Sequence, residues 1–110
     1  MASRTSHRIT PSSGNVFADL GLPDATELQT KARLGAAICR IVEQKGLTQS
    51  QLAERLGIGQ PKVSDLLRYR LEGYSVERLM RFLVALGQDV EIVVRAKPRS
   101  RSARIAVTAA

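Results

Sequence analysis

Hydrophobic residues recur at three- and four-residue spacing along four stretches of the chain, and this spacing is typical of amphipathic helices. On the longest stretch, Leu28, Ala32, Cys39 and Val42 share one stripe. Glycines or short polar segments interrupt the pattern between the stretches. The four predicted helices cover residues 25–45, 49–56, 60–68 and 76–86.

Capping residues mark the ends of these predicted helices. A side chain that can accept a hydrogen bond from an early backbone N–H precedes three of them, at Asp24, Thr48 and Ser75. Glycine tolerates the left-handed conformation that ends many helices, and it follows the second and fourth helices at Gly57 and Gly87. The helix boundaries are therefore predicted from local signals.

A different pattern follows the last predicted helix. Val90, Ile92 and Val94 alternate with other residues over 89–95, which predicts a short β-strand. A single strand leaves its backbone groups unpaired and needs a partner. The candidates are the segment near Val16, the same strand of a second copy, and the sheet edge of another protein.

Length and composition favour one small α-rich domain. The chain has 110 residues, of which 44% are hydrophobic and 25% charged, close to the averages for folded proteins. Aromatic residues make up only 4% and Trp is absent, so Leu, Ile, Val and Ala must form the core. We predict a mainly α fold, a small four- to five-helix bundle with a short C-terminal β-strand.

Cysteine and histidine are too scarce for several kinds of site. Cys39 is the lone cysteine and cannot form a disulfide within the chain, and His7 is the lone histidine. The two do not supply the ligand set of a zinc site. We expect no metal, no cofactor and no thiol catalysis, and we interpret Cys39 as a small buried hydrophobic residue.

The positive charge lies at the two ends of the sequence. The formal net charge is +7, and residues 14–94 are neutral because their basic and acidic residues are equal in number. Two of the seven charges come from Arg4 and Arg8. The other five come from Arg95, Lys97, Arg99, Arg101 and Arg104. Bulk charge therefore predicts only non-specific attraction to polyanions.

The same counts divide the chain into three parts. We predict a flexible arm over 1–13, a folded domain over 14–95 and a flexible basic tail over 96–110. A second interpretation of the tail is that its apolar end, from Ile105, folds back on the domain. No stretch approaches the roughly 20 apolar residues of a membrane span, so we expect no membrane and a cytoplasmic protein.

The region from Gln49 to Leu66 contains the most specific pattern. Two short helices are joined by a tight turn that contains Gly57, and the small Ala53 stands where the helices must approach closely. Inward positions are apolar throughout: Leu52, Leu56, Ile58, Val63 and Leu66. This arrangement predicts a helix-turn-helix.

The run GLTQSQLAERLGIGQPKVSDLLR resembles the helix-turn-helix of the Cro/phage-repressor proteins, the xenobiotic-response-element (XRE) family. More narrowly, GNVFADLGLPDATEL, QPKVSDLL and SVERLMRFLVALGQDVEIVV resemble HigA-type antitoxins and regulators. The resemblance covers about residues 14–95 and implies a lambda-repressor-like DNA-binding domain. It also implies that the 60–68 helix enters the major groove by its N-terminal end.

Candidate base-reading residues lie on the polar face of that helix. They are Gln60, Pro61, Ser64 and Asp65. A Gln amide can pair with adenine, a Ser hydroxyl can donate or accept, and proline can contact a thymine methyl group. Asp65 could accept from a cytosine amine, or it could be a solvated carboxylate. The family more commonly has a hydrogen-bond donor where Pro61 stands.

Candidate phosphate contacts come from other positions. Gln49 begins the 49–56 helix at the family position that clamps the DNA backbone, where the positive helix end favours an anion. Lys62, Arg68 and Arg70 could add positioning charge, or each could be a solvated surface cation.

The resulting prediction is a sequence-specific DNA-binding repressor of double-stranded operator DNA. We expect a homodimer, with Val90, Ile92 and Val94 as its interface. The HigA resemblance adds a ribonuclease-type toxin as a possible partner. The alternative is a protein-interaction module that binds a partner through the terminal strand without DNA. An enzyme is disfavoured, because the predicted folded region has no paired carboxylates, Ser/His or Cys/His sets.

Overall fold

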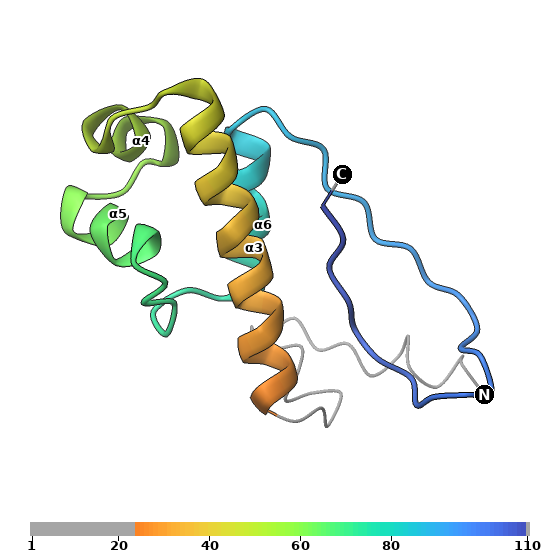
Figure 1. The fold of residues 1–110 in the computed structure, drawn as a ribbon. Coiled ribbons are helices and arrows are strands. Elements are labelled where there is room, and N and C mark those ends of the chain that lie inside the picture. The colour runs from red at the N-terminus through yellow and green to blue at the C-terminus, as the bar shows by residue number, and fades with distance from the viewer. Residues whose placement is uncertain (1–23, 110) are drawn as a thin grey trace.

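The computed structural model describes residues 24–109, which contain four α-helices followed by an irregular segment (Figure 1). The helices are α3 (Asp24–Lys45), α4 (Gln49–Leu56), α5 (Gln60–Leu67) and α6 (Val76–Ala85). The four predicted helices are thus confirmed to within a residue at each end. The predicted arm over 1–13 and the apolar segment that follows it up to residue 22 lie outside the described residues.

Two of the predicted caps are present as hydrogen bonds. The Thr48 hydroxyl accepts from the Gln51 N–H at 3.1 Å, and the Gln51 side chain accepts from the Thr48 N–H at 2.9 Å. The Ser75 hydroxyl accepts from the Arg78 N–H at 3.1 Å. These bonds satisfy backbone donors that have no partner inside the helix, so α4 and α6 begin where the sequence predicts.

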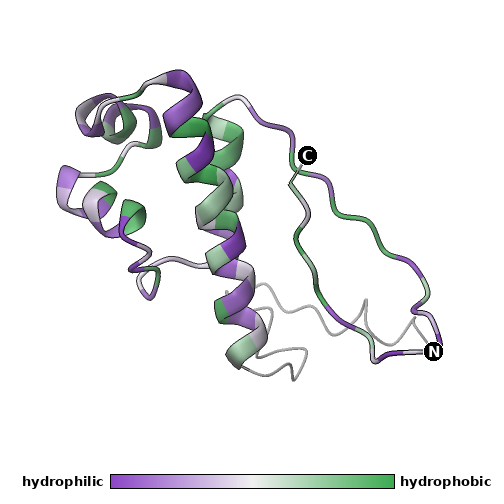
Figure 2. Ribbon diagram, in the orientation of Figure 1, coloured by the Kyte–Doolittle hydropathy of each residue, from purple (hydrophilic) through white to green (hydrophobic). Residues whose placement is uncertain are grey.

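The core is mainly aliphatic and lies where α3 and α6 pack against each other and against α4 and α5. In Figure 2, α5 carries hydrophilic residues on the side away from α3 and hydrophobic residues on the side toward it. Six large side chains are almost fully enclosed: Ile38, Leu52, Val63, Leu66, Leu79 and Leu86. Their burial fixes which face of α4 and α5 remains exposed.

The linker between α5 and α6 contributes to the core more than its composition suggests. Leu71 and Tyr74 are buried, and the Tyr74 ring meets Phe82 of α6 edge to face, with centroids 5.6 Å apart. Gly35 of α3 allows this linker to approach closely, because a Cβ there would lie 3.3 Å from Leu71 Cδ1. The linker is therefore a packed element that joins α5 to α6.

The predicted β-strand over 89–95 is not formed, and residues 24–109 contain no strand at all. Val90 packs against the core, whereas Ile92 and Val94 are 77% and 90% exposed. The alternation predicted an extended conformation, but no neighbouring segment pairs with this backbone within the described chain. The chain then turns at residues 99–100 and returns beside α3 (Figure 1).

Candidate nucleic-acid interface

The turn between α4 and α5 reverses the chain in three residues. Gly57 caps α4 in the left-handed conformation, with φ 69°, and its N–H donates to the Ala53 carbonyl. The Ile58 N–H donates to the same carbonyl at 3.1 Å. α5 begins directly after Gly59, and α4 and α5 pack against each other. This is the helix-turn-helix that the glycine spacing predicts.

The polar face of α5 is exposed to solvent along most of the helix. Gln60, Pro61 and Arg68 are exposed, as is Lys62 at the flank. Ser64 and Asp65 are partly buried as whole residues, and the Asp65 side chain is 51% exposed. Val63 and Leu66, both fully buried, hold the opposite face against the core. The structure thus places the predicted base-reading residues on one side, with Gln60 and Pro61 more accessible than Ser64 and Asp65.

The first turns of α4 and α5 favour anions. Neither helix has an acidic residue in its first turn, whereas α6 has Glu77 there. The N-terminal end of a helix carries a partial positive charge, which an acidic side chain would offset. Gln49, exposed at the start of α4, therefore lies where a phosphate is electrostatically favoured.

Two of the predicted DNA contacts face each other. Arg70 lies 3.9 Å from Asp65 by a nitrogen-to-oxygen distance, and both side chains are more than half exposed. The Arg70 N–H also donates to the Asp65 carbonyl at 2.8 Å. Because exposed pairs of this kind contribute little to stability, a phosphate can compete for Arg70. Asp65 sits beside a cation and not beside a second carboxylate.

Tyr74 is a structural part of this site that the sequence analysis missed. Its hydroxyl donates to the Lys62 carbonyl of α5 at 2.7 Å, and burial raises the pKa of Tyr74 above its ordinary value. The Lys62 ammonium and the Arg78 guanidinium lie 5.7 Å and 5.4 Å from the centre of its ring. The partners are 12 residues apart, so no local sequence pattern could have revealed the bond.

Comparisons with known proteins agree with this geometry. Residues 16–95 match a family described as "Helix-turn-helix domain". A solved structure named "Putative XRE Family Transcriptional Regulator" is 61% identical, with a TM-score of 0.77, over 80% of this chain and all of that one. The chain belongs to the XRE family of helix-turn-helix proteins. No curated protein matches it.

Membership of the XRE family confirms the predicted helix-turn-helix and makes the chain a DNA-binding regulator. The narrower HigA resemblance, the dimer and the roles of individual residues stay predictions. Within residues 24–109, no helix is long and apolar enough to cross a membrane.

The remaining candidate chemistry of this XRE protein is weak. Cys39 is half-buried on α3, and desolvation raises the pKa of its thiol above the ordinary value, against a smaller opposing effect of a hydrogen bond with Tyr69. A raised pKa keeps the less reactive thiol form at neutral pH. In the described part of the chain, no three His, Cys, Asp or Glu side chains are grouped to hold a metal.

Proposed function

We propose that the chain is a sequence-specific transcriptional repressor that inserts α5 into the major groove of an operator. The observation that carries this proposal is the orientation of α5. Buried Val63 and Leu66 turn Gln60 and Pro61 outward at the N-terminal end of the helix. An α-helix presented in this way fits the width of the major groove of B-DNA.

Each α5 residue then has a role that its chemistry supports. Gln60 pairs with the hydrogen-bonding edge of an adenine, and Pro61 contacts a thymine methyl group. Ser64 and Asp65 lie further along the helix and contact bases that approach its flank. Because both residues are less exposed than Gln60, they contribute less to base recognition in this proposal.

Phosphate contacts flank this reading face. Gln49 binds the DNA backbone at the N-terminal end of α4, where no acidic side chain opposes a phosphate. Lys62, Arg68 and Arg70 add sequence-independent attraction around α5. The weak pair between Arg70 and Asp65 exchanges for an Arg70 phosphate contact when DNA binds.

A mobility shift on duplex DNA from the chain's own promoter tests this function. We expect a shifted complex that unlabelled promoter DNA competes away and that the same amount of scrambled duplex does not. Lys62→Gln combined with Arg68→Gln should weaken binding to both duplexes. Arg55→Gln combined with Arg81→Gln removes the same charge from exposed positions of α4 and α6, and it serves as the control. Equal competition by promoter and scrambled DNA would contradict operator recognition.

We further propose a homodimer, because one recognition helix reads only a few base pairs and paired half-sites are one DNA turn apart. The proposed interface contains Val90, Ile92 and Val94. The exposure of Ile92 and Val94 supports it, since apolar side chains left in water gain stability by contact with a second copy.

An antitoxin role rests on the resemblance to HigA-type proteins. In this proposal the chain also binds and neutralises a ribonuclease-type toxin encoded beside it. Co-expression with the neighbouring reading frame tests the idea, since that frame alone should arrest growth and this chain should restore it. If the neighbouring reading frame is not toxic, the antitoxin role is contradicted and the proposed repressor function is unaffected.

A further inference from the structure

A basic loop, residues 95–104, carries most of the excess charge of the chain. Its five cations are Arg95, Lys97, Arg99, Arg101 and Arg104, and it contains no Asp or Glu. Four of them are exposed and Arg101 is half-buried. The ion pairs found among residues 24–109 all lie on or beside the helices, and none involves this loop. The charge of the basic loop is therefore available to an external anion.

The basic loop is held at both ends. Val90 before it and Val107 after it pack against the core cluster. On the returning segment, Ile105 and Val107 are half-buried while their neighbours Arg104, Ala106 and Thr108 are exposed, the alternation of an extended chain with one face covered.

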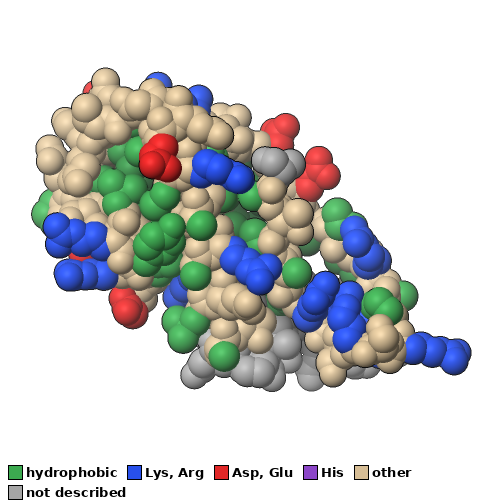
Figure 3. Space-filling model, in the orientation of Figure 1, with side chains coloured by type: hydrophobic (Ala, Val, Ile, Leu, Met, Phe, Trp, Pro, Cys, Tyr) green, Lys and Arg blue, Asp and Glu red, His purple; other side chains and the backbone are tan. Residues whose placement is uncertain are grey.

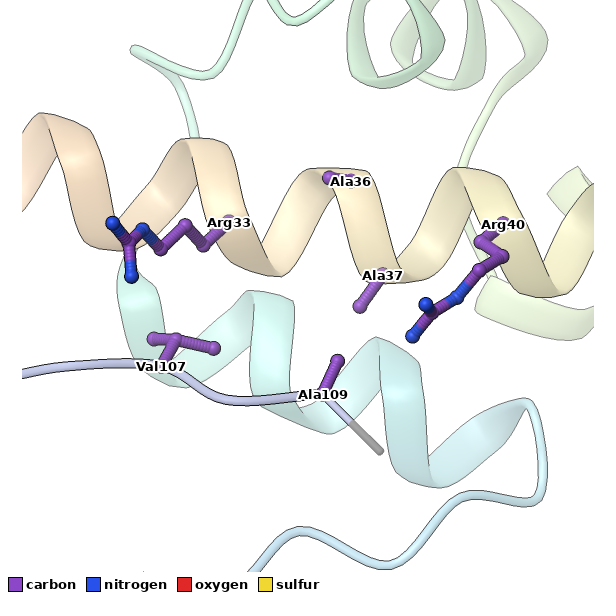
Figure 4. Close-up of a pocket in the computed structure, with 6 residues that line it drawn as sticks. All are labelled: Arg33, Ala36, Ala37, Arg40, Val107 and Ala109. Atoms are coloured by element: carbon purple, nitrogen blue, oxygen red, sulfur yellow. The ribbon is translucent and has the colours of Figure 1, made fainter.

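Figure 4 shows the second attachment. Val107 and Ala109 lie along α3 at a hollow of about 300 Å³, which Arg33, Ala36, Ala37 and Arg40 line from the helix. The small alanine side chains let the extended segment approach the helix, and the aliphatic part of each arginine can flank it. The basic loop thus projects from a defined place on the bundle.

That place is on the opposite side of the bundle from α5. In Figure 1, α4 and α5 lie on one side of α3, and the two extended segments that carry the basic loop lie on the other. Figure 3 shows Lys and Arg side chains gathered along those segments, with the body of the domain between them and the α4–α5 side. A straight duplex contacted by α5 therefore does not reach the loop of the same chain.

We propose that the basic loop is a second, sequence-independent DNA-binding surface that holds another duplex segment while α5 holds the operator. Five cations on a loop that contains no carboxylate displace condensed counterions from a phosphate backbone, which is the main source of non-specific binding. The loop is irregular and has no helix that could enter a DNA groove and contact base edges. Its ligand is therefore the phosphate backbone. The protein then bridges two duplex segments. This inference rests on the proposed DNA-binding function of α5.

A two-duplex capture experiment tests the bridge with the full chain. Promoter duplex is immobilised on beads, the protein is bound and washed, and a labelled scrambled duplex is added at low salt. We expect the wild-type protein to retain the second duplex. The loop variant Lys97→Gln, Arg99→Gln, Arg104→Gln should retain at least about tenfold less, and the salt slope of capture should fall by roughly 2–3 units, about 0.9 for each lost phosphate contact.

A control variant distinguishes the loss of positive charge in general from the loss of charge on the basic loop. Lys45→Gln, Arg55→Gln, Arg81→Gln removes three exposed cations from α3, α4 and α6, none of which lines the hollow beside Val107, and it should still capture the second duplex. Circular dichroism checks that both variants fold. Equal capture by the two variants would overturn the proposal.

Four further outcomes show which part of the proposal has failed. Absence of protein on the immobilised promoter would contradict the function of α5, whereas promoter binding without capture would contradict the second surface alone. If the wild type captures no second duplex, and the loop variant binds the promoter duplex with a weaker salt dependence than the wild type, the loop contacts the operator itself. Wild-type binding to phosphatidylserine vesicles without duplex capture would overturn DNA as the ligand.

Discussion

The Tyr74 hydroxyl donates a hydrogen bond of 2.7 Å to the carbonyl of Lys62, and this bond ties the linker before α6 to the first half of α5. The Tyr74 ring also packs edge to face on Phe82 of α6. One side chain therefore connects the helix that presents Gln60 to a helix in the core. Its effect is to fix the orientation of α5, which the proposed recognition role of that helix requires.

Removing this hydroxyl should destabilise the domain while leaving its core filled. We expect Tyr74→Phe to lower the free energy of unfolding by about 0.5–1.5 kcal/mol, the usual net value of one hydrogen bond. Urea denaturation measures the change. Tyr69→Phe is the comparison variant, because Tyr69 is 50% exposed and within residues 24–109 its hydroxyl meets only the Cys39 thiol, a weak hydrogen-bonding partner, so its substitution should change stability by less than about 0.5 kcal/mol. Equal losses would mean that the Tyr74 bond contributes nothing specific.

The same tyrosine predicts a pH dependence at the alkaline end. Burial raises the pKa of Tyr74 in the folded state, so the unfolded chain releases this proton at a lower pH. The stabilisation is fully present below pH about 10, the ordinary tyrosine value, and is lost as the pH rises through the folded-state pKa. Unfolding free energies of wild type and Tyr74→Phe should therefore converge above pH 10. A constant difference up to pH 11 would contradict this.

Substitutions at Gln60 and Gln49 should weaken DNA binding in different ways. We expect Gln60→Ala to lose roughly 1–3 kcal/mol of binding to the specific operator and to relax the preference at one base pair. Gln49→Ala should weaken binding to matched and mismatched duplexes alike, because a phosphate contact carries no sequence information. Titrations against a panel of single-base operator variants distinguish the two. The same loss of discrimination in both would show that the roles of α4 and α5 are misassigned.

The position of Gly57 requires glycine because of its backbone conformation, and not because a larger side chain would lack room. Its φ is 69°, and a Cβ built there meets nothing within 4 Å. We expect Gly57→Ala to lower the free energy of unfolding by roughly 1–2 kcal/mol, with a smaller loss for Gly57→Asn, which tolerates the left-handed region. Gly73→Ala is the control, since Gly73 has equal space without a positive φ. Thermal unfolding of the three variants tests this, and an unchanged Gly57→Ala would contradict it.

The proposed dimer interface can be tested by placing a charged residue in it. Light scattering at high micromolar concentration should report a dimer for the wild type and a monomer for Ile92→Asp, because a buried unpaired carboxylate is unfavourable. Val84→Asp changes an apolar residue of α6 that is 60% exposed, and it should remain a dimer. A monomeric wild type, or a dimer unaffected by Ile92→Asp, would remove residues 89–95 as the interface.

The chain's local patterns were sufficient for the helices and their ends. Thr48, Gln51, Gly57 and Ser75 each act within one turn of helix, so their spacing alone predicts where α4 and α6 begin and where α4 ends. The exposed face of α5 was predictable for the same reason. Val63 and Leu66 recur at helical spacing and face the core, so the opposite side of the helix, which includes Gln60 and Pro61, is left exposed.

Tertiary structure alone decided the contacts between distant segments. Alternation over 89–95 indicated an extended chain, but pairing depends on a neighbour that the sequence does not specify, and none lies beside it within residues 24–109. The bond from Tyr74 to Lys62 and the seating of Val107 on α3 join residues many positions apart. Such contacts form only where the packed helices bring the segments together, because their free energy depends on proximity in space and not on spacing along the chain.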